Sequence, residues 1–264
     1  MKIKLLIITI GIITVVAGCK KEDDSPPAVL DEVTGLISES LDSLDNQLES
    51  AATLLAGGVT DYTVYRTKLK ELLTKVSFLE ESAYVNSQGK LLLVEPSKYS
   101  MYEGTSFSDD TVIMYVINQH QPYFTGYFTA IEGFGAVADI HPVYKGLTSF
   151  GALEGLFVPA DLLARLITPL VSSPYEIWVM EKRGTILYEP DLAGNGKNIF
   201  TDPFFAGLEE FKTACRKIAD NDTGMTTYTY YVTGSLTETI SKKVWWNTVK
   251  LHKNEWKVIW SQEL

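Results

Sequence analysis

Cysteine and histidine are scarce in this chain of 264 residues, which contains two cysteines and three histidines. Cys19 lies at the end of an N-terminal apolar stretch, so only Cys215 remains for the rest of the chain and no intrachain disulfide is expected. Cys215 falls within a helical pattern of apolar residues, which favours a buried structural thiol over a reactive one. His120, His141 and His252 are widely spaced and show no zinc-binding motif such as HExxH, so the sequence predicts no metal site and no cofactor.

Positive charge is also in short supply, since 23 Lys and Arg residues face 33 Asp and Glu residues, for a net charge of −10. Without a Lys/Arg cluster, this balance argues against binding to nucleic acid or, through charge, to anionic lipid. Beyond the N-terminal stretch no apolar run is long enough to cross a bilayer.

Catalytic motifs are missing as well. The stretch Asn195-Gly196-Lys197-Asn198 lacks the other glycines and the Ser or Thr of a phosphate-binding loop, and no serine stands in a Gly-x-Ser-x-Gly context. The pairs Glu80-Glu81 and Asp109-Asp110 are adjacent, and neighbouring side chains point apart on a strand, which favours solvated surface over acid–base catalysis. The sequence therefore predicts a protein that is not an enzyme.

The N-terminus has the layout of a secretory signal. A basic start precedes an apolar stretch over residues 5–16, which is shorter than a membrane-spanning helix, and then come Val16-Ala17-Gly18-Cys19. Small residues before a cysteine match the lipobox read by lipoprotein signal peptidase, so we predict cleavage after residue 18 and acylation of Cys19, for example with palmitate. The alternatives are an ordinary signal peptide or an uncleaved anchor. Lipidation predicts a protein held on a membrane of the cell envelope and facing outside the cytoplasm.

The segment after the cleavage site is polar and contains two prolines, so residues 19–28 read as a tether. Its Lys-Lys-Glu-Asp-Asp run is similar to charged signals that export some lipoproteins, or is simply a solvated spacer. Apolar residues then recur every three or four positions from Leu30 to Leu55 and again from Tyr62 to Val76. This periodicity predicts helices over residues 29–76, interrupted at Gly57-Gly58.

The hydrophobic period changes to two beyond residue 77. Two β-hairpins are predicted, one turning at Gly89 and one at Gly184, and each is followed by Glu-Pro. We interpret the repetition as an internal duplication of two α+β units, although chance similarity of two hairpins is the alternative. Gly89 and Gly184 should then occupy matching turns.

Four stretches of this sequence resemble extracellular Cache domains in their double form, namely residues 83–96, 122–144, 151–167 and 175–203. The last is the most specific, with an apolar strand, a glycine turn, Ile-Leu-Tyr, an acidic residue and then Gly-Lys-Asn. The resemblance implies an α+β fold in which a long N-terminal helix precedes two PAS-like antiparallel-sheet modules.

The division of the chain follows from this resemblance. We expect a distal module over residues 77–158, a connecting helix over residues 159–172 and a proximal module over residues 173–264. Family members usually continue into a transmembrane helix and a signalling module, which this sequence does not show. The resemblance therefore implies a small-molecule sensor that acts through a separate membrane signalling protein.

The predicted ligand site lies in the distal module, on Tyr123, Tyr127, Phe134 and Asp139. Tyr123 and Tyr127 would share one face of a strand, and small residues around Asp139 would leave space beside the sheet. An aromatic core without a pocket is the alternative, and the proximal module around Tyr188 and Asp191 is the next candidate.

The identity of the ligand is left open by departures from the family. The amino-acid-binding subset carries an Arg-x-Trp pair, absent between residues 97 and 121, and an Asp on the closing strand, absent from residues 152–157. The leading function is thus an extracytoplasmic lipoprotein that binds a small molecule as a sensory or accessory domain. A scaffold that binds a protein partner through its long helix is the alternative, and a surface enzyme is less favoured.

Overall fold

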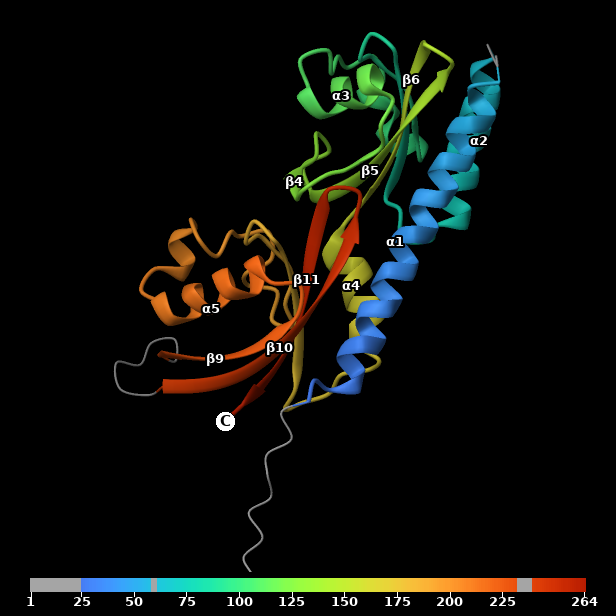
Figure 1. Cartoon of the computed structure of the whole chain (residues 1–264). Coiled ribbons are helices and arrows are strands. Elements are labelled where there is room, and N and C mark those ends of the chain that lie inside the picture. Colours follow the sequence, from blue (N-terminus) through green and yellow to red (C-terminus); the bar gives the residue numbers. More distant parts are fainter. Residues whose placement is uncertain (1–24, 58–60, 232–238) are drawn as a thin grey trace, which may run out of the picture.

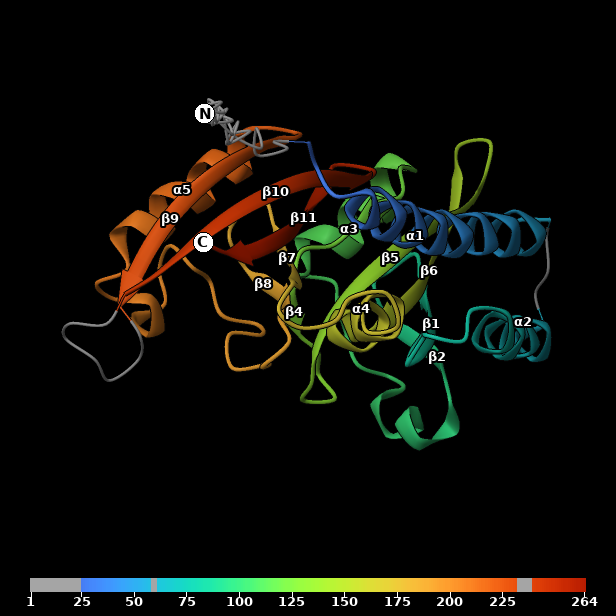
Figure 2. The same cartoon turned by 90° about the horizontal axis from the view of Figure 1, so that it is seen from below.

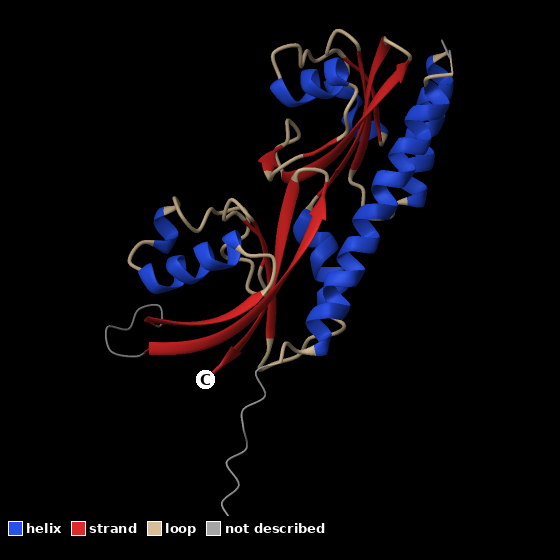
Figure 3. Ribbon diagram, in the orientation of Figure 1, coloured by secondary structure: helices blue, strands red, loops and turns tan. Residues whose placement is uncertain are grey.

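The computed structural model describes residues 25–57, 61–231 and 239–264. The lipobox and Cys19 lie outside the described residues. The chain forms two β-sheets along one side of a long helix, with further helices on the outer face of each sheet (Figures 1 and 3). This is an α+β fold with a long N-terminal helix and two antiparallel sheets, as the sequence predicts. No helix in the described part has the length and apolar character needed to span a membrane.

The long helix is α1 (Ala28–Leu55), and it forms because apolar residues recur on one face at helical spacing. Its buried residues are Leu30, Val33, Ile37, Leu41, Leu44, Leu48, Ala51, Ala52 and Leu55. Helix α2 (Tyr62–Lys75) begins at Asp61, whose side chain accepts a hydrogen bond from the backbone N–H of Thr63. Seen from below, α1 runs past both modules and α2 covers only the distal one (Figure 2).

The distal sheet has the strand order β2-β1-β6-β5-β3, with β4 also paired to β5. These strands are β1 (Glu81–Asn86), β2 (Leu91–Glu95), β3 (Tyr123–Phe124), β4 (Phe128–Thr129), β5 (Gly135–Lys145) and β6 (Thr148–Phe157). The 3-10 helix η1 (Ser97–Tyr102) and helix α3 (Thr111–Gln119) lie on one face, while α1 and α2 lie on the other.

The proximal sheet has the equivalent order β8-β7-β11-β10-β9. These strands are β7 (Glu176–Glu181), β8 (Ile186–Tyr188), β9 (Gly224–Tyr231), β10 (Thr239–Leu251) and β11 (Asn254–Glu263). Helix α4 (Pro159–Ile167) joins the modules, and η2 (Pro203–Phe205) and α5 (Glu209–Asp220) cover the outer face. Cys215 of α5 is buried there, as predicted. The two sheets thus repeat one topology.

The hairpin turns show the same repetition in detail. Gly89 and Gly184 have φ angles of +76° and +92°, which glycine adopts at little steric cost. In each turn the glycine N–H donates to the carbonyl three residues earlier, on Asn86 and Glu181. The prediction of matching turns is confirmed.

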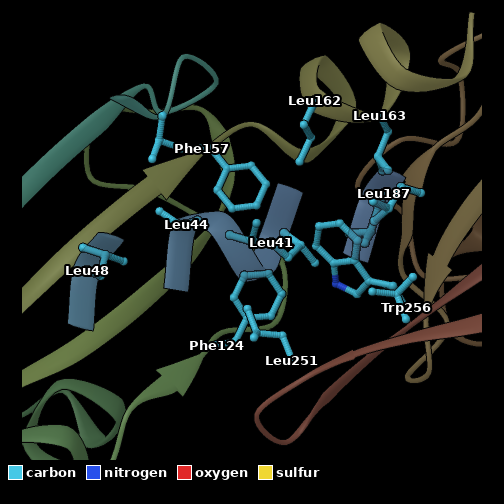
Figure 4. Packing of buried hydrophobic residues seen from close by; sticks show 14 of the residues in the cluster. Leu41, Leu44, Leu48, Phe124, Phe157, Leu162, Leu163, Leu187, Leu251 and Trp256 are labelled. Atoms are coloured by element: carbon cyan, nitrogen blue, oxygen red, sulfur yellow. The ribbon is translucent and has the colours of Figure 1, made fainter. Parts of the chain in front are cut away.

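The two modules share one core where α1 crosses between them. Phe124 and Phe157 of the distal module pack against Trp256 of the proximal module, with ring centroids 5.5 and 6.3 Å from the indole. Leu41 and Leu44 of α1 lie beside these rings (Figure 4). Because one continuous core joins α1 with both sheets, a change in one module has a packed route to the other.

Candidate functional site

The distal module contains a cavity of about 340 Å³ on the α3 side of its sheet. This volume falls within the range of small-molecule sites. Its apolar wall comes from the sheet, from α3 and from the loop before α3, and includes Leu91, Phe107, Val112, Ile113, Ile140 and Leu156. Its Asp, Glu and Arg residues are Glu81, Asp110, Glu132, Glu154 and Arg183.

Strand register brings the two central carboxyl groups together. Ala83 of β1 pairs with Glu154 of β6, and Glu81 pairs with Leu156. Because alternate residues of a strand share a face, Glu81 and Glu154 both project toward α3. They lie 73 positions apart in the sequence, so only the pairing of β1 with β6 makes them neighbours.

Both carboxyl groups hold protons more tightly than glutamate does in water. Burial raises the pKa of Glu81 to about 9, and the negative charges of Glu154 and Glu132 add to the effect. Burial likewise raises the pKa of Glu154 to about 7, reinforced by the charges of Glu132 and Asp110. The cavity therefore has too little positive charge to balance its acids. A bound cation would lower the pKa values of Glu81 and Glu154 and stabilise their ionised forms.

Glu81 is only 4% exposed, and its Oε2 atom makes no hydrogen bond of normal geometry among the described residues, although the nearby Glu132 carboxyl interacts with Glu81 and helps to raise its pKa. A buried oxygen without a partner costs free energy, so a donor that reached it would be favoured. Asp110 is different, because its Oδ1 caps α3 by accepting the N–H groups of Val112 and Ile113. The polar wall of the cavity thus has a buried oxygen at Glu81 that a ligand donor could reach.

The proximal module also reaches this cavity. Arg183, in the β7–β8 turn, contributes a basic side chain, the only one that borders the cavity among the described residues. Nearby, the backbone N–H of Tyr127 donates to Oε1 of the buried Glu181 at 2.7 Å. The cavity therefore lies where the two modules meet.

The structure places the predicted site residues in different surroundings. Tyr123 and Tyr127 border the cavity, although they belong to separate segments, β3 and the loop before β4, and not to one strand. Phe134 packs in the core under α3, with its ring centroid 6.3 Å from that of Tyr99. Asp139 does not border the cavity, because its neighbour Ile140 faces that side and alternation turns Asp139 toward α1.

Glu81 and Glu154 are not predicted as site residues from the sequence. The pair Glu80-Glu81 is predicted to be solvated surface, and this is wrong for Glu81, which is buried. Glu80 does lie near the surface, where it pairs with Lys98. Glu154 is the one charged residue of the closing strand β6, and its neighbours from Phe150 to Phe157 are otherwise apolar or glycine. An isolated acid in such a strand is a usable signal, because a buried carboxyl group needs a reason to be there.

The alternative proximal site divides in two. Asp191 borders a cavity of about 280 Å³ together with Glu189, Trp178 and Tyr228. Tyr188 instead belongs to the core on the α1 side of the sheet. The proximal cavity lacks a buried carboxylate oxygen without a partner in the part of the chain that the structure describes.

Comparison with known proteins agrees with this fold. Residues 39–159 match the family model described as "HK/GC/Chemotaxis protein-like, sensor domain". A search of curated proteins finds no match to the sequence. The resemblance to Cache-type sensory domains is confirmed by the family model and by solved structures.

Three solved structures illustrate the likeness. An extracellular ligand-binding receptor from Desulfohalobium retbaense is 22% identical, with a TM-score of 0.72 over 88% of this chain and 39% of the receptor, so this chain spans well under half of it. The ligand-binding domain of Pseudomonas fluorescens chemoreceptor CtaA, in complex with L-serine, is 16% identical, with a TM-score of 0.68 over 89% of this chain and 94% of that domain. The ligand-binding domain of Pseudomonas aeruginosa amino acid chemoreceptor PctC, in complex with GABA, is 17% identical, with a TM-score of 0.63 over 89% of this chain and 96% of that domain. The fold is that of double-Cache ligand-binding domains.

Proposed function

We propose that this chain is an extracytoplasmic sensor domain whose distal cavity binds a small organic molecule carrying a protonated amine. The observation that carries the proposal is the pair Glu81 and Glu154, held on one cavity wall with raised pKa values. An ammonium group would satisfy the buried Oε2 of Glu81 and stabilise the charged form of both acids.

The ligands in two of the similar structures also carry an ammonium group. The similar domains of CtaA and PctC are in complex with L-serine and with GABA, both of which carry an ammonium group. In this chain the carboxylate of such a ligand would reach Arg183 at the cavity edge, while the ammonium would face Glu81 and Glu154. Because the described lining holds several acids and a single arginine, the ammonium is the stronger recognition element.

The output of such a sensor would pass through contacts between the modules. A ligand in the cavity would touch Tyr127, whose backbone is bonded to Glu181 of β7, and Arg183 two residues further. Closure of these contacts would alter the core shared with α1. The receiver would be a separate membrane signalling protein.

Acylation of Cys19 is our proposal for how the domain is held at a membrane. Its support is the lipobox-type sequence Val16-Ala17-Gly18-Cys19. Labelled palmitate should enter the wild-type protein and not the Cys19→Ala variant, which should leave the membrane or keep its leader. Equal labelling of the two proteins would refute lipidation at this residue.

The scaffold alternative loses its specific support. It depended on an exposed apolar stripe along α1, and the stripe from Leu30 to Leu55 is buried against the two sheets. The solvent-facing part of α1 is mainly polar, and Leu54 is its one large exposed apolar side chain among the described residues. Nothing in the described cavity favours the enzyme alternative over binding.

A thermal-shift series with matched ligands tests the amine proposal. Pairs such as arginine and agmatine, or ornithine and putrescine, differ only in the carboxylate, and succinate supplies an anion without an amine. A ligand at 100 times its Kd stabilises by about 2.7 kcal/mol, which corresponds to roughly 5–10 °C for a domain of this size. We expect at least one amine, and no simple carboxylic acid, to produce such a shift.

Substitutions then locate the site. Glu154→Gln should abolish the shift, whereas Asp191→Asn in the proximal cavity should leave it intact. A shift that survives Glu154→Gln and disappears with Asp191→Asn would move the site to the proximal module. Binding confined to anions would refute the amine chemistry itself.

A further inference from the structure

A second group of ionisable side chains lies on the other side of the distal sheet, where three elements meet. Asp45 comes from α1, Asp139 and His141 from β5, and His252 from the turn between β10 and β11. One ligand atom from each of the four residues lies within 4.8 Å of the others. Figure 1 shows the tip of the β10–β11 hairpin beside β5 and α1.

The distances within this group fit a small coordination sphere. Nε2 of His141 and Nε2 of His252 lie 3.6 and 3.5 Å from the two oxygens of Asp139. In tetrahedral zinc, with bonds of about 2.1 Å, ligand atoms lie about 3.4 Å apart. Oδ1 of Asp45 is closer, at 2.7 and 2.8 Å from the two imidazoles, so this carboxylate would move outward by a fraction of an ångström.

Asp139 supplies an independent observation. Its side chain is fully buried, and neither of its oxygens has a hydrogen-bond partner among the described residues. The imidazole nitrogens of His141 and His252 are beyond normal hydrogen-bonding distance from it. A buried carboxylate is costly unless it is paired or coordinates a metal, so Asp139 requires either protonated imidazoles at 3.5 and 3.6 Å or a metal ion.

We propose that Asp45, Asp139, His141 and His252 bind one divalent transition-metal ion, with Zn²⁺ as the best fit. Two imidazole nitrogens and two carboxylate oxygens match the ligand types that zinc prefers, and the two carboxylates balance the charge of the ion. The ion would join α1, the distal sheet and the proximal hairpin. It would therefore stiffen the junction through which the modules communicate, whatever ligand the distal cavity takes.

The competing explanation is an ion-pair cluster without metal. Burial lowers the pKa values of His141 and His252, but Asp139 and Asp45 outweigh it and raise both to about 9, so the two rings would carry charge. Such a cluster would stabilise the junction in the same place. It differs from a metal site in requiring no zinc.

Direct titration separates the two. The full chain, purified without a polyhistidine tag and stripped with EDTA, is titrated with ZnCl₂ against a chromophoric chelator, and bound zinc is counted by mass spectrometry. We expect one zinc per chain and a zinc-dependent rise in melting temperature. Ca²⁺, which prefers oxygen ligands, should not compete.

The chain offers a matched control for the key histidine. His252 and His120 both adopt left-handed backbone conformations, with φ of 49° and 54°, which asparagine tolerates. His120 stacks on Tyr144, away from the cluster. His252→Asn should weaken zinc binding by about 100-fold or more, since even outer-shell changes cost 10- to 100-fold, and His120→Asn should not weaken it.

Asp139→Asn should weaken binding as His252→Asn does, and circular dichroism verifies that each variant is folded. Should Asp139→Asn fail to fold, His252→Asn, at a partly exposed turn, decides the question. Three results would each overturn the proposal in favour of the ion-pair cluster. They are less than one zinc per chain, equal zinc affinity of His252→Asn and His120→Asn, and a melting temperature that does not change with zinc.

Discussion

Replacing Glu81 by glutamine should stabilise the ligand-free protein at neutral pH. Glutamine has nearly the shape of the protonated acid and carries no charge to bury. In the fold the pKa of Glu81 is about 9, because burial and the charges of Glu154 and Glu132 oppose ionisation. In the unfolded chain the pKa is the ordinary value of 4.5.

The sign of the effect follows from proton binding. Between pH 4.5 and 9 the folded state keeps a proton on Glu81 that the unfolded state releases, so the free energy of unfolding falls as pH rises. The contribution is complete below pH 4.5 and is lost progressively up to pH 9. Each pH unit costs about 1.4 kcal/mol, so at pH 7 the wild type should have lost on the order of 3 kcal/mol.

Urea denaturation of the wild type and Glu81→Gln at pH 4.5, 6, 7 and 8 measures this difference. The two proteins should be similarly stable at pH 4.5. At pH 7 the variant should be more stable by on the order of 3 kcal/mol, which raises the melting temperature by roughly 6–12 °C for a domain of this size. Such a gain in stability is typical of substitutions in a binding site, where residues needed for function lower the stability of the fold.

The neighbouring residue provides a control of opposite sign. Burial raises the pKa of Glu80, but hydrogen bonds from Lys98 and Tyr99 outweigh it and lower the pKa below its usual value. Stability from Glu80 is therefore present at neutral pH and lost in acid, so Glu80→Gln should destabilise at pH 7. If Glu81→Gln matched the wild type at every pH, or were less stable at pH 7, the electrostatic description of the cavity would be wrong.

Two further predictions concern the packing of the fold. Trp256 is buried in the core between the modules, so Trp256→Ala should lower the free energy of unfolding by about 3–5 kcal/mol and Trp256→Phe by much less. Equal losses for the two variants in urea denaturation would show that the indole does not fill this core. Gly151→Ala should cost more than Gly133→Ala, because both have positive φ (139° and 91°) but only at Gly151 would a Cβ meet backbone, 2.0 Å from the oxygen of Val85. Thermal melts that rank them in the opposite order would contradict the close approach of β1 and β6.

The architecture of this chain could be predicted because it depends on local patterns. Apolar residues every three or four positions predict helix α1. Beyond residue 77 the period of two predicts strands, because successive side chains of a strand point to opposite faces of the sheet. The matching hairpins at Gly89 and Gly184 follow from turn chemistry. Each of these signals lies within about 30 residues of sequence, where side-chain spacing alone sets the structure.

Tyr123 and Tyr127 could be placed at the cavity because aromatic residues near a predicted sheet are a local feature. The face on which Asp139 lies could not be predicted from the sequence, because side chains alternate along β5 and a shift of one residue reverses every assignment. Only the observed pairing of β5 with β6 fixes that register.

Long-range contacts were decided by the tertiary structure alone. Glu81 meets Glu154 because β1 pairs with β6, and Asp45 meets His141 across 96 positions because α1 packs on β5. The sequence determined the helices, the hairpins and their repetition, since each depends on the spacing of neighbouring residues. The tertiary structure determined which carboxylates and imidazoles share a site, because packing between distant segments sets their distances and the burial that shifts their pKa values.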